Sequence, residues 1–563
     1  MNKLISVFIV TLFIVACAQD KSYTEKLQEQ ILKSYNTPIR PGYEGRNPYW
    51  NKFAKKFMYA PAFDFKAVDG AETYRYTVKE SVQDSTSMTW IFTAEAPNLA
   101  LSPIWKDIPV GDVELKVEAL DKDGNVIEIA GMRKFYRDSP FTPPYHGAVR
   151  DYKESAVLAM LCIHNMEPIQ NWKKGPHPDM SYNLNTYPAK IVSSTISMEV
   201  LLSEYCPELK EDALKIAENA AQFLIDQSLP EDAPLAFFPP TYYGDLITSA
   251  IARNKGKTMT MEALTAATAF LDLYDATGKQ EYFDRAMKIT DTYASLQAED
   301  GSFPIKMDFK TGVPVNEVKA MLHPMLEYLQ RLEQQYGITT YNDMFTKAEA
   351  WMKNGALKSF DMTGQFEDSR IVGLEPYENL TNCTAAPYAT FLLEKSLTTE
   401  EELADAKDLI NFCEDQFVYW ASPEKKYGVQ LHHTPHVVEQ YRYRMPIDHS
   451  ACNVANAWLS LYEETGDEIA FMKAKALIDN ITIMQDINTG MIPTYWTNFL
   501  VAENWTNCTL LSVQTLLRMA EITGQAGNDE YVMPDLIGHL NTKYLRRHPC
   551  EGVSFFCLPP SRP

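Results

Sequence analysis

A repeated helical unit is the feature that most constrains the fold of this chain. The segment LYDATGKQEYFDRAMKITDTYASLQAEDGSFP begins at Leu273, and LYEETGDEIAFMKAKALIDNITIMQDINTGMIP begins at Leu461. Each runs from the end of one helix through a Thr-Gly turn into an amphipathic helix, and then through a polar loop to Gly and Pro. A third copy of the turn, AEITG, begins at Ala520. Such self-similarity predicts an array of helix pairs in which inner and outer helices alternate.

The helical pattern covers most of the chain. Apolar residues recur at helical spacing in segments such as KESAVLAMLCIHNM and EDALKIAENAAQFLIDQS. At roughly 50 to 60 residues per pair, the stretch holds about six or seven pairs. A second duplication, ENLTNCT from Glu378 and ENWTNCT from Glu503, is typical of the start of an inner helix, with Thr or Asn as its cap.

This pattern resembles the (α/α)6 toroid of bacterial glycan-degrading enzymes. The resemblance implies a central cleft that is lined by residues of the inner helices and their loops. An open solenoid that binds proteins is the alternative. Aromatic residues in the loops and the polar cluster described below favour the toroid.

Residues 56–140 predict a small β domain, because apolar and polar residues alternate there with a period of two. Asp123-Gly124 is a hairpin signal between two such runs. The segment PAFDFKAVDGAETYRYTV resembles the first strands of fibronectin type III-like modules, which implies a β-sandwich; any small antiparallel domain is the alternative. The predicted fold is therefore mainly α, a toroid preceded by a small β-sandwich.

The first residues predict export. The apolar run LISVFIVTLFIVA is too short for a stable transmembrane helix and ends before Cys17. The residues IVAC resemble a bacterial lipobox, which implies lipidation of Cys17 and a lipoprotein in the outer membrane, facing the periplasm or the surface; a plain secretory signal is the alternative. The predicted organisation is a signal peptide (1–16), a lipidated tether (17–55), a β-sandwich (56–140), a catalytic toroid (141–525) and an irregular basic tail (526–563).

Charge and cysteine content narrow the partners. A net charge of −22 argues against nucleic acid, since phosphate binding needs a basic surface. It leaves room for an anionic substrate in a local basic pocket, because screening limits repulsion to about 8–10 Å. The cysteines after Cys17 show no CxxC spacing and no Cys/His zinc motif, so buried thiols are expected rather than disulfides.

The segment LHHTPHVVEQYRYRMPIDHS (431–450) holds four of the ten histidines of the chain. Tyrosine and histidine suit proton transfer, and arginine binds a carboxylate through two hydrogen bonds. If YRYR is extended, one of its two faces has a structural role. The predicted catalytic residues are Tyr441, Tyr443, His432, His433, His436 and His449, and the predicted carboxylate-binding residues are Arg442 and Arg444.

Loops between the helices supply predicted substrate contacts, since a glycan site needs aromatic platforms and amide hydrogen-bonders. For each aromatic residue taken alone, core packing is the alternative. The predicted substrate-binding residues outside the cluster are Asn382, Tyr377, Tyr495, Trp496 and Tyr187.

These residues predict β-elimination at a uronic acid. A base removes the proton at C5, an acid protonates the leaving oxygen at C4, and a cation neutralises the carboxylate. The chain resembles toroidal polysaccharide lyases and oligosaccharide dehydratases of Bacteroidota glycan systems, including those that consume ulvan. The alternatives are a glycoside hydrolase on the same toroid, which is an exo-glucuronidase or unsaturated uronyl hydrolase, and a non-catalytic glycan-binding lipoprotein.

A metal is not part of this prediction. His432 or His433 with His436 has helical spacing for zinc, but Pro435 disrupts a helix there and no acidic residue falls at the expected offset. We therefore expect no cofactor, although a structural ion is compatible with the segment.

Overall fold

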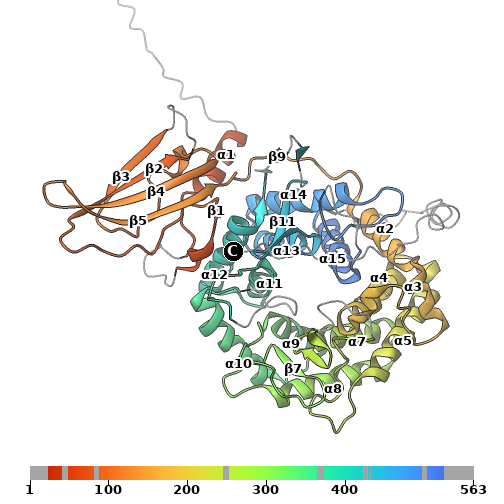
Figure 1. The fold of residues 1–563 in the computed structure, drawn as a ribbon. Helices are drawn as coiled ribbons and strands as arrows, with labels where there is room; N and C mark the ends of the chain where they lie inside the picture. Colours follow the sequence, from red (N-terminus) through yellow and green to blue (C-terminus); the bar gives the residue numbers. More distant parts are fainter. Residues whose placement is uncertain are drawn as a thin grey trace, which may run out of the picture.

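The computed structural model describes residues 23–40, 49–81, 88–244, 253–363, 373–421, 425–426, 429–430, 433–497 and 504–524. Within these residues the protein is mainly helical, with a mixed β-sheet at its N-terminal side (Figure 1). The predicted signal peptide, Cys17 and the whole of the predicted tail lie outside the described residues, so these predictions stay untested. No described helix combines the length and the apolar character needed to cross a bilayer.

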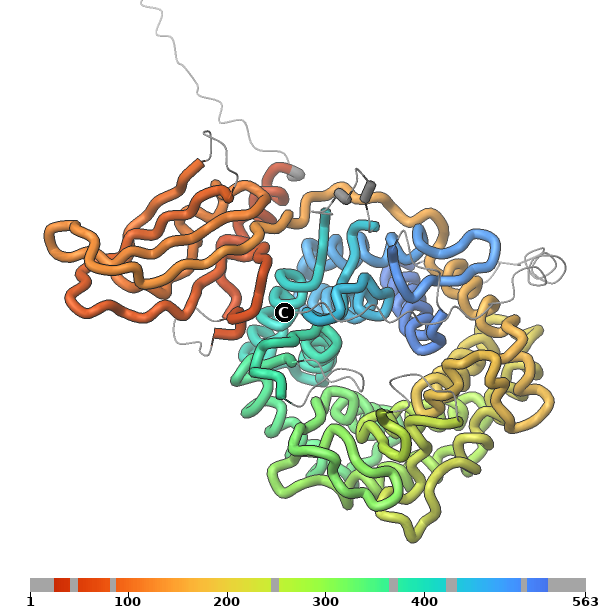
Figure 2. Tube along the Cα trace, viewed as in Figure 1, coloured from red at the N-terminus to blue at the C-terminus, as the bar shows by residue number. Residues whose placement is uncertain are grey.

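Helices pack into a closed ring (Figures 1 and 2). In the described part of the chain, six helices form its inner layer: α4 (Pro188–Tyr205), α7 (Glu262–Thr277), α9 (His323–Tyr336), α11 (Asn382–Leu393), α13 (Asp448–Thr465) and α15 (Thr506–Ile522). Each packs against the next in this order, and α15 packs against α4. Their outer partners are α2 (Tyr152–His164), α5 (Lys210–Gln227), α8 (Gln280–Leu296), α10 (Asn342–Met352), α12 (Glu400–Phe417) and α14 (Glu468–Met484).

The Thr-Gly turn of the sequence repeat has the same structure in two units. Gly278 and Gly466 follow α7 and α13 with left-handed φ values of 68° and 70°. Glycine ends a helix in this way at no steric cost. The preceding hydroxyls of Thr277 and Thr465 donate to the carbonyls four residues earlier, at 2.6 Å in both cases. The duplicated sequence therefore corresponds to a duplicated helix end, where the chain turns from an inner to an outer helix.

The N-terminal strands form one mixed sheet in the order β1-β5-β4-β2-β3. These strands are β1 (Lys56–Phe57), β2 (Thr73–Glu80), β3 (Thr89–Ala94), β4 (Gly111–Leu120) and β5 (Val126–Arg137), and only β1 and β5 pair in parallel. The expected β-sandwich is corrected here, since the described residues place irregular chain instead of a second sheet over the buried face. Pro97, Pro103 and Pro109 lie in that covering chain, and proline cannot donate to a strand ladder.

The predicted tether is also corrected where it is described. Residues 23–34 form helix α1 (Tyr23–Ser34), whose Ile31 is fully buried, and Tyr35 is buried directly after it. This segment packs on the ring through a buried carboxylate, Glu414 of α12. Glu414 accepts hydrogen bonds from the hydroxyls of Tyr35 (2.6 Å) and Tyr59 (2.7 Å), the indole of Trp420 (2.9 Å) and the ammonium of Lys473 (2.5 Å). The described part of residues 17–55 is thus fixed to the ring.

Short elements connect the helices. The described ones are β6 (Lys257–Met259), β7 (Lys306–Asp308), β8 (Val418–Tyr419), β9 (Lys425–Lys426), β10 (Val429–Gln430), β11 (His436–Gln440), β12 (Tyr443–Pro446), α3 (Glu167–Gln170) and short 3-10 or π turns. Strands β8, β11 and β12 form a small sheet, which leads into the start of α13. This sheet carries most of the polar segment that was singled out in the sequence.

Candidate functional site

The polar segment 431–450 does not form one cluster. Strands β11 and β12 make a hairpin with Gln440 opposite Tyr443, so that residues 441 and 442 lie in its turn. The turn rests on the chain before α11, because the amide of Tyr441 donates to the carbonyl of Leu380 at 3.1 Å. The hairpin therefore separates side chains that are adjacent in sequence. Tyr441 and Arg442 lie in the turn, whereas Tyr443 and Arg444 lie on β12.

The side chains of the hairpin turn contact the outer helix α12 and the chain before α11. The Tyr441 hydroxyl donates to Gln416 of the outer helix α12 at 2.5 Å, and burial raises its pKa well above its ordinary value. Arg442 forms an ion pair with Glu378, and the Arg444 guanidinium lies 5.9 Å from the Tyr441 ring centroid. Tyr443 is 40% exposed. These contacts hold the hairpin in place at the rim of the ring.

The histidines of the segment are dispersed. His432 lies outside the described residues. His433 is exposed, and its carbonyl contacts Nδ1 of His436. His436 is buried and stacks on Tyr419 of β8, with ring centroids 5.0 Å apart. The shared proton-transfer site predicted for these histidines has no support in this arrangement.

Most predicted substrate-binding residues have structural contacts. Asn382 is fully buried, and its amide donates to the carbonyls of Val438 (2.6 Å) and Glu439 (3.0 Å), so direct contact with substrate is wrong for this residue. It holds β11 against the start of α11. Trp496 is also fully buried, and its predicted role as a platform is likewise corrected. Tyr377 is buried, and its hydroxyl donates to the carbonyl of Ser359 at 2.9 Å.

Two aromatic predictions lie near inner helix starts. Tyr187 immediately precedes α4 and packs on Tyr242 and Trp505, with ring centroids 5.9 and 5.8 Å apart. Its side chain is nearly buried, whereas Trp505, just before α15, is half-buried. Tyr495 is half-buried, and its backbone pairs with Ile447, directly before α13. Substrate contact by Tyr187 or Tyr495 stays a prediction.

His449 is the predicted catalytic residue that faces the inner side of the ring. It is the second residue of α13, is half-buried, and its Nδ1 nitrogen has no hydrogen-bond partner among the described residues. The neighbouring Asp448 carboxyl accepts hydrogen bonds from the His449 amide (2.7 Å) and from the Ser512 hydroxyl (3.3 Å). Burial, and then the charge of Lys190, lower the His449 pKa to about 4. At neutral pH this side chain is therefore an uncharged imidazole.

Lys190 and Glu262 are candidate residues that the sequence patterns did not single out. Lys190 is in the first turn of α4 and Glu262 begins α7, and their charged atoms lie 3.2 Å apart. Helix α15 lies between α4 and α13 in the ring order, yet Lys190 affects the His449 pKa. Lys190 and His449 therefore lie near each other at the N-terminal ends of two inner helices. Their only sequence signal was position, since each lies in the first turn of an inner helix.

The fold has weak similarity to solved structures. No family model and no curated protein matches the sequence. A family 76 glycoside hydrolase from a bovine Bacteroides thetaiotaomicron strain is similar with a TM-score of 0.44 and 11% identity, over 82% of this chain and 100% of that chain. An unsaturated glucuronyl hydrolase specific for heparin gives 0.42 and 11% over 66% and 97%, and a polysaccharide lyase gives 0.40 and 13% over 82% and 65%. The activity has to be inferred from the chain's own residues.

The inner helices carry polar residues along one face. On α13, His449, Asn453, Asn456 and Ser460 follow one another at steps of four, three and four residues, the spacing of one helix side. The Asn456 amide donates to Thr515 of α15 at 2.9 Å, and the Ser460 hydroxyl donates to Glu394 after α11 at 2.7 Å. These hydrogen bonds join neighbouring inner helices, and Asn453 and Ser460 are buried. We call these inner faces the ring interior.

Glu327 belongs to the same layer. It follows His323 by four residues on α9, and its side chain is exposed at the surface of the helix. Desolvation, and then the nearby charge of Glu394, raise its pKa to about 8. A carboxyl group with this pKa is mostly protonated at neutral pH and can donate a hydrogen bond.

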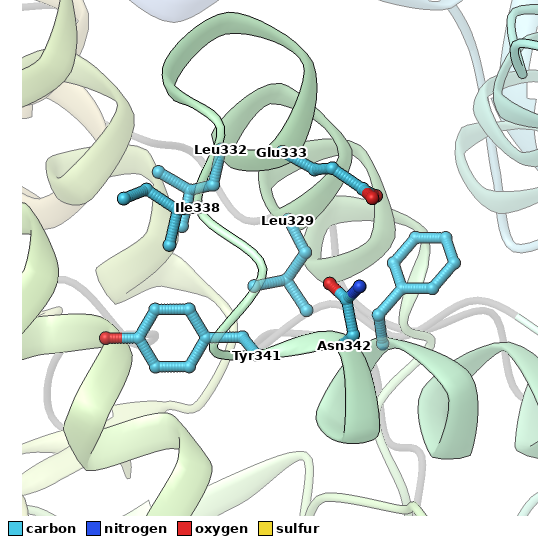
Figure 3. A pocket seen from close by; sticks show the side chains of 7 residues that line it. Leu329, Leu332, Glu333, Ile338, Tyr341 and Asn342 are labelled. Carbon is cyan, nitrogen blue, oxygen red and sulfur yellow. The ribbon is translucent and has the colours of Figure 1, made fainter.

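Two further features do not add to the site. In the described residues, no three His, Cys, Asp or Glu side chains are placed to hold a metal ion together. A hollow between α9 and α10 is lined mainly by apolar side chains such as Leu329, Leu332 and Phe345 (Figure 3). It leaves no room for a water molecule, so it is a packing gap.

Proposed function

We propose that the ring is an (α/α)6 toroid and that it cleaves or dehydrates uronate-containing glycans by β-elimination, leaving a 4,5-unsaturated uronyl end. The observation that carries this proposal is an uncharged His449 at the start of α13, with the Lys190 ammonium at the start of α4 near enough to influence its pKa. A neutral imidazole is a competent base near neutral pH, and a partly buried ammonium attracts a carboxylate.

The reaction needs one base, one acid and one cation. His449 takes the proton from C5, the released electron pair forms the C4–C5 double bond, and the bond from C4 to its oxygen breaks. The imidazolium that forms returns its proton to the leaving oxygen, so His449 ends neutral. Lys190 lies beside the substrate carboxylate and stabilises the charge that develops on it in the transition state. The leaving group is a sugar in a lyase and water in a dehydratase.

Hydrolysis on the same interior is the second candidate, and Glu327 favours it. Glycoside hydrolysis uses a protonated and an ionised carboxyl group on either side of the bond. Glu327 is protonated at neutral pH, and Glu262 of the adjacent helix α7 is paired with a cation. Pairs of carboxyl groups with separated pKa values mark acid and base roles.

A panel of uronic oligosaccharides, analysed by mass and by ultraviolet absorbance, tests the proposal. Elimination creates a conjugated double bond that absorbs, whereas hydrolysis adds one water and creates none. Products with the new absorbance support elimination. Products that have gained water, with activity lost in Glu327→Gln, replace it by hydrolysis, and binding without turnover indicates a glycan-binding protein.

The pH profile is expected to follow His449. As the pH falls through about 4, the imidazole gains a proton and the base is lost, so kcat/KM should decrease on the acid side with a midpoint near that value. Because the folded-state pKa lies below the ordinary 6.5, the stability that this group contributes is present above 6.5 and is lost as the pH falls through about 4. Urea unfolding of wild type and His449→Gln over this window should show a smaller pH dependence in the variant.

Replacing Lys190 is expected to weaken the use of acidic substrates. In Lys190→Met, loss of the charged contact should raise the activation free energy by about 2 kcal/mol, which lowers kcat/KM roughly 30-fold. Lys190→Arg keeps the cation and should retain most of the activity. Steady-state kinetics on one uronic oligosaccharide would measure both. Equal losses in the two variants would contradict a role for the positive charge.

A further inference from the structure

A second cavity lies at the opposite end of the ring from the candidate site. It measures about 430 Å³ and is bounded by the first turn of α2, the end of α4 and the last turns of α15. Its volume is within the roughly 300–1,000 Å³ of small-molecule sites. The residues that line it include Lys153, Tyr205, Gln514, Leu517, Arg518 and Glu521. All of them come from helices α2, α4 and α15.

Tyr205 gives this cavity an aromatic wall. It is the last residue of α4, and 37% of it is exposed. The Lys153 ammonium lies 5.7 Å from its ring centroid and restrains the ring from one side. Leu517, on the next-to-last turn of α15, extends the apolar surface. An exposed aromatic face beside an apolar wall suits the C–H face of a sugar ring.

Polar groups with fixed directions surround that wall. The Arg518 guanidinium forms ion pairs with Glu463 and with Glu394 (2.9 Å) and donates to the Ser460 hydroxyl at 3.0 Å. Three partners set its orientation before any ligand binds. The exposed amide of Gln514, one turn earlier, and the carboxylate of Glu521 supply donors and acceptors of different kinds. Among these groups, the preorganised Arg518 can bind a hydroxyl at low entropic cost.

The local charge selects against an acidic ligand. Two cations, Lys153 and Arg518, stand against four nearby carboxylates, Glu204, Glu394, Glu463 and Glu521. We infer that this cavity is a separate, non-catalytic binding site for a neutral sugar unit of a glycan. It differs in preference from the ring interior, and it does not depend on the reaction that is proposed there.

Calorimetric titration of the whole protein with neutral disaccharides tests this inference, with a glucuronic acid-containing disaccharide titrated for comparison. We expect at least one neutral disaccharide to bind in the millimolar range or better. Tyr205→Ala should weaken that binding by at least about tenfold. Tyr205→Phe keeps the ring and should bind like wild type, and Gln514→Ala should bind more weakly.

Several results would overturn the inference. These are no binding by any neutral disaccharide at saturating concentration, unchanged binding in Tyr205→Ala, or tighter binding of the uronate-containing disaccharide. Thermal unfolding of each variant shows whether it is folded. Comparison of Tyr205→Phe with Gln514→Ala separates the contribution of the Tyr205 aromatic ring from that of the neighbouring polar groups. Turnover in the ring interior is measured separately and should be unaffected by Tyr205→Ala.

Discussion

His449→Ala is expected to lower kcat by about 100- to 10,000-fold, the range for loss of a general base. The melting temperature should change little, since Nδ1 of the half-buried ring has no hydrogen-bond partner among the described residues. Initial rates on uronic oligosaccharides and a thermal melt of the same preparation provide the two measurements. A catalytic base would account for this combination, because its loss removes the proton transfer while Nδ1 has no hydrogen bond to lose among the described residues.

Tyr443→Phe is the matched comparison. Tyr443 lies in the exposed hairpin of β11 and β12, so we expect that loss of its hydroxyl in Tyr443→Phe leaves most of the turnover. Inactive Tyr443→Phe together with active His449→Ala would reverse the assignment and return the chemistry to the hairpin. Loss of folding in His449→Ala, visible as a lower melting temperature, would instead show a structural role for this histidine.

Glu414→Ala is expected to lower the free energy of unfolding by about 3–5 kcal/mol, the cost of removing one partner of a buried ion pair. The substitution leaves the buried Lys473 ammonium without its carboxylate, and it removes the acceptor of Tyr35, Tyr59 and Trp420 at once. Urea unfolding followed by circular dichroism measures the change.

Glu401→Ala is the control for that loss. Its carboxylate pairs with Lys353 at 3.2 Å, but both side chains are largely exposed, so the expected change is below about 1 kcal/mol. Similar losses in the two variants would mean that burial of the Glu414 network adds no stability beyond that of a surface pair.

The helical ring could be predicted from the sequence because its signals are local. Leu273–Gly278 and Leu461–Gly466 each specify a helix end and a turn within six residues, and repetition specifies stacking. The sheet was harder. The alternating runs predicted the strands of 73–137, but the fibronectin-like resemblance implied a second sheet. Prolines such as Pro97 and Pro109 lie between β3 and β4 and argue against more strands there.

The candidate site was predicted only in part, because proximity in sequence was taken as proximity in space. Tyr441 and His449 are eight positions apart, yet one faces the outer helix α12 and the other the ring interior. Lys190 and Glu262 come from distant segments that only ring closure brings together. Periodicity predicts which side of a helix is apolar, but it does not show which polar side chains meet across a ring.

The attachment of residues 23–60 to helices α12 and α14 has a consequence for how the chain can be shortened. A gene fragment that starts in the proline-rich connection near residue 140 would encode every helix of the ring but neither Tyr35 nor Tyr59. The fragment would expose a hydrophobic and charged surface that the full-length chain covers, and it would be prone to aggregate during expression. Recombinant work on this ring therefore has to begin upstream of helix α1, although no residue of that helix is near the proposed chemistry.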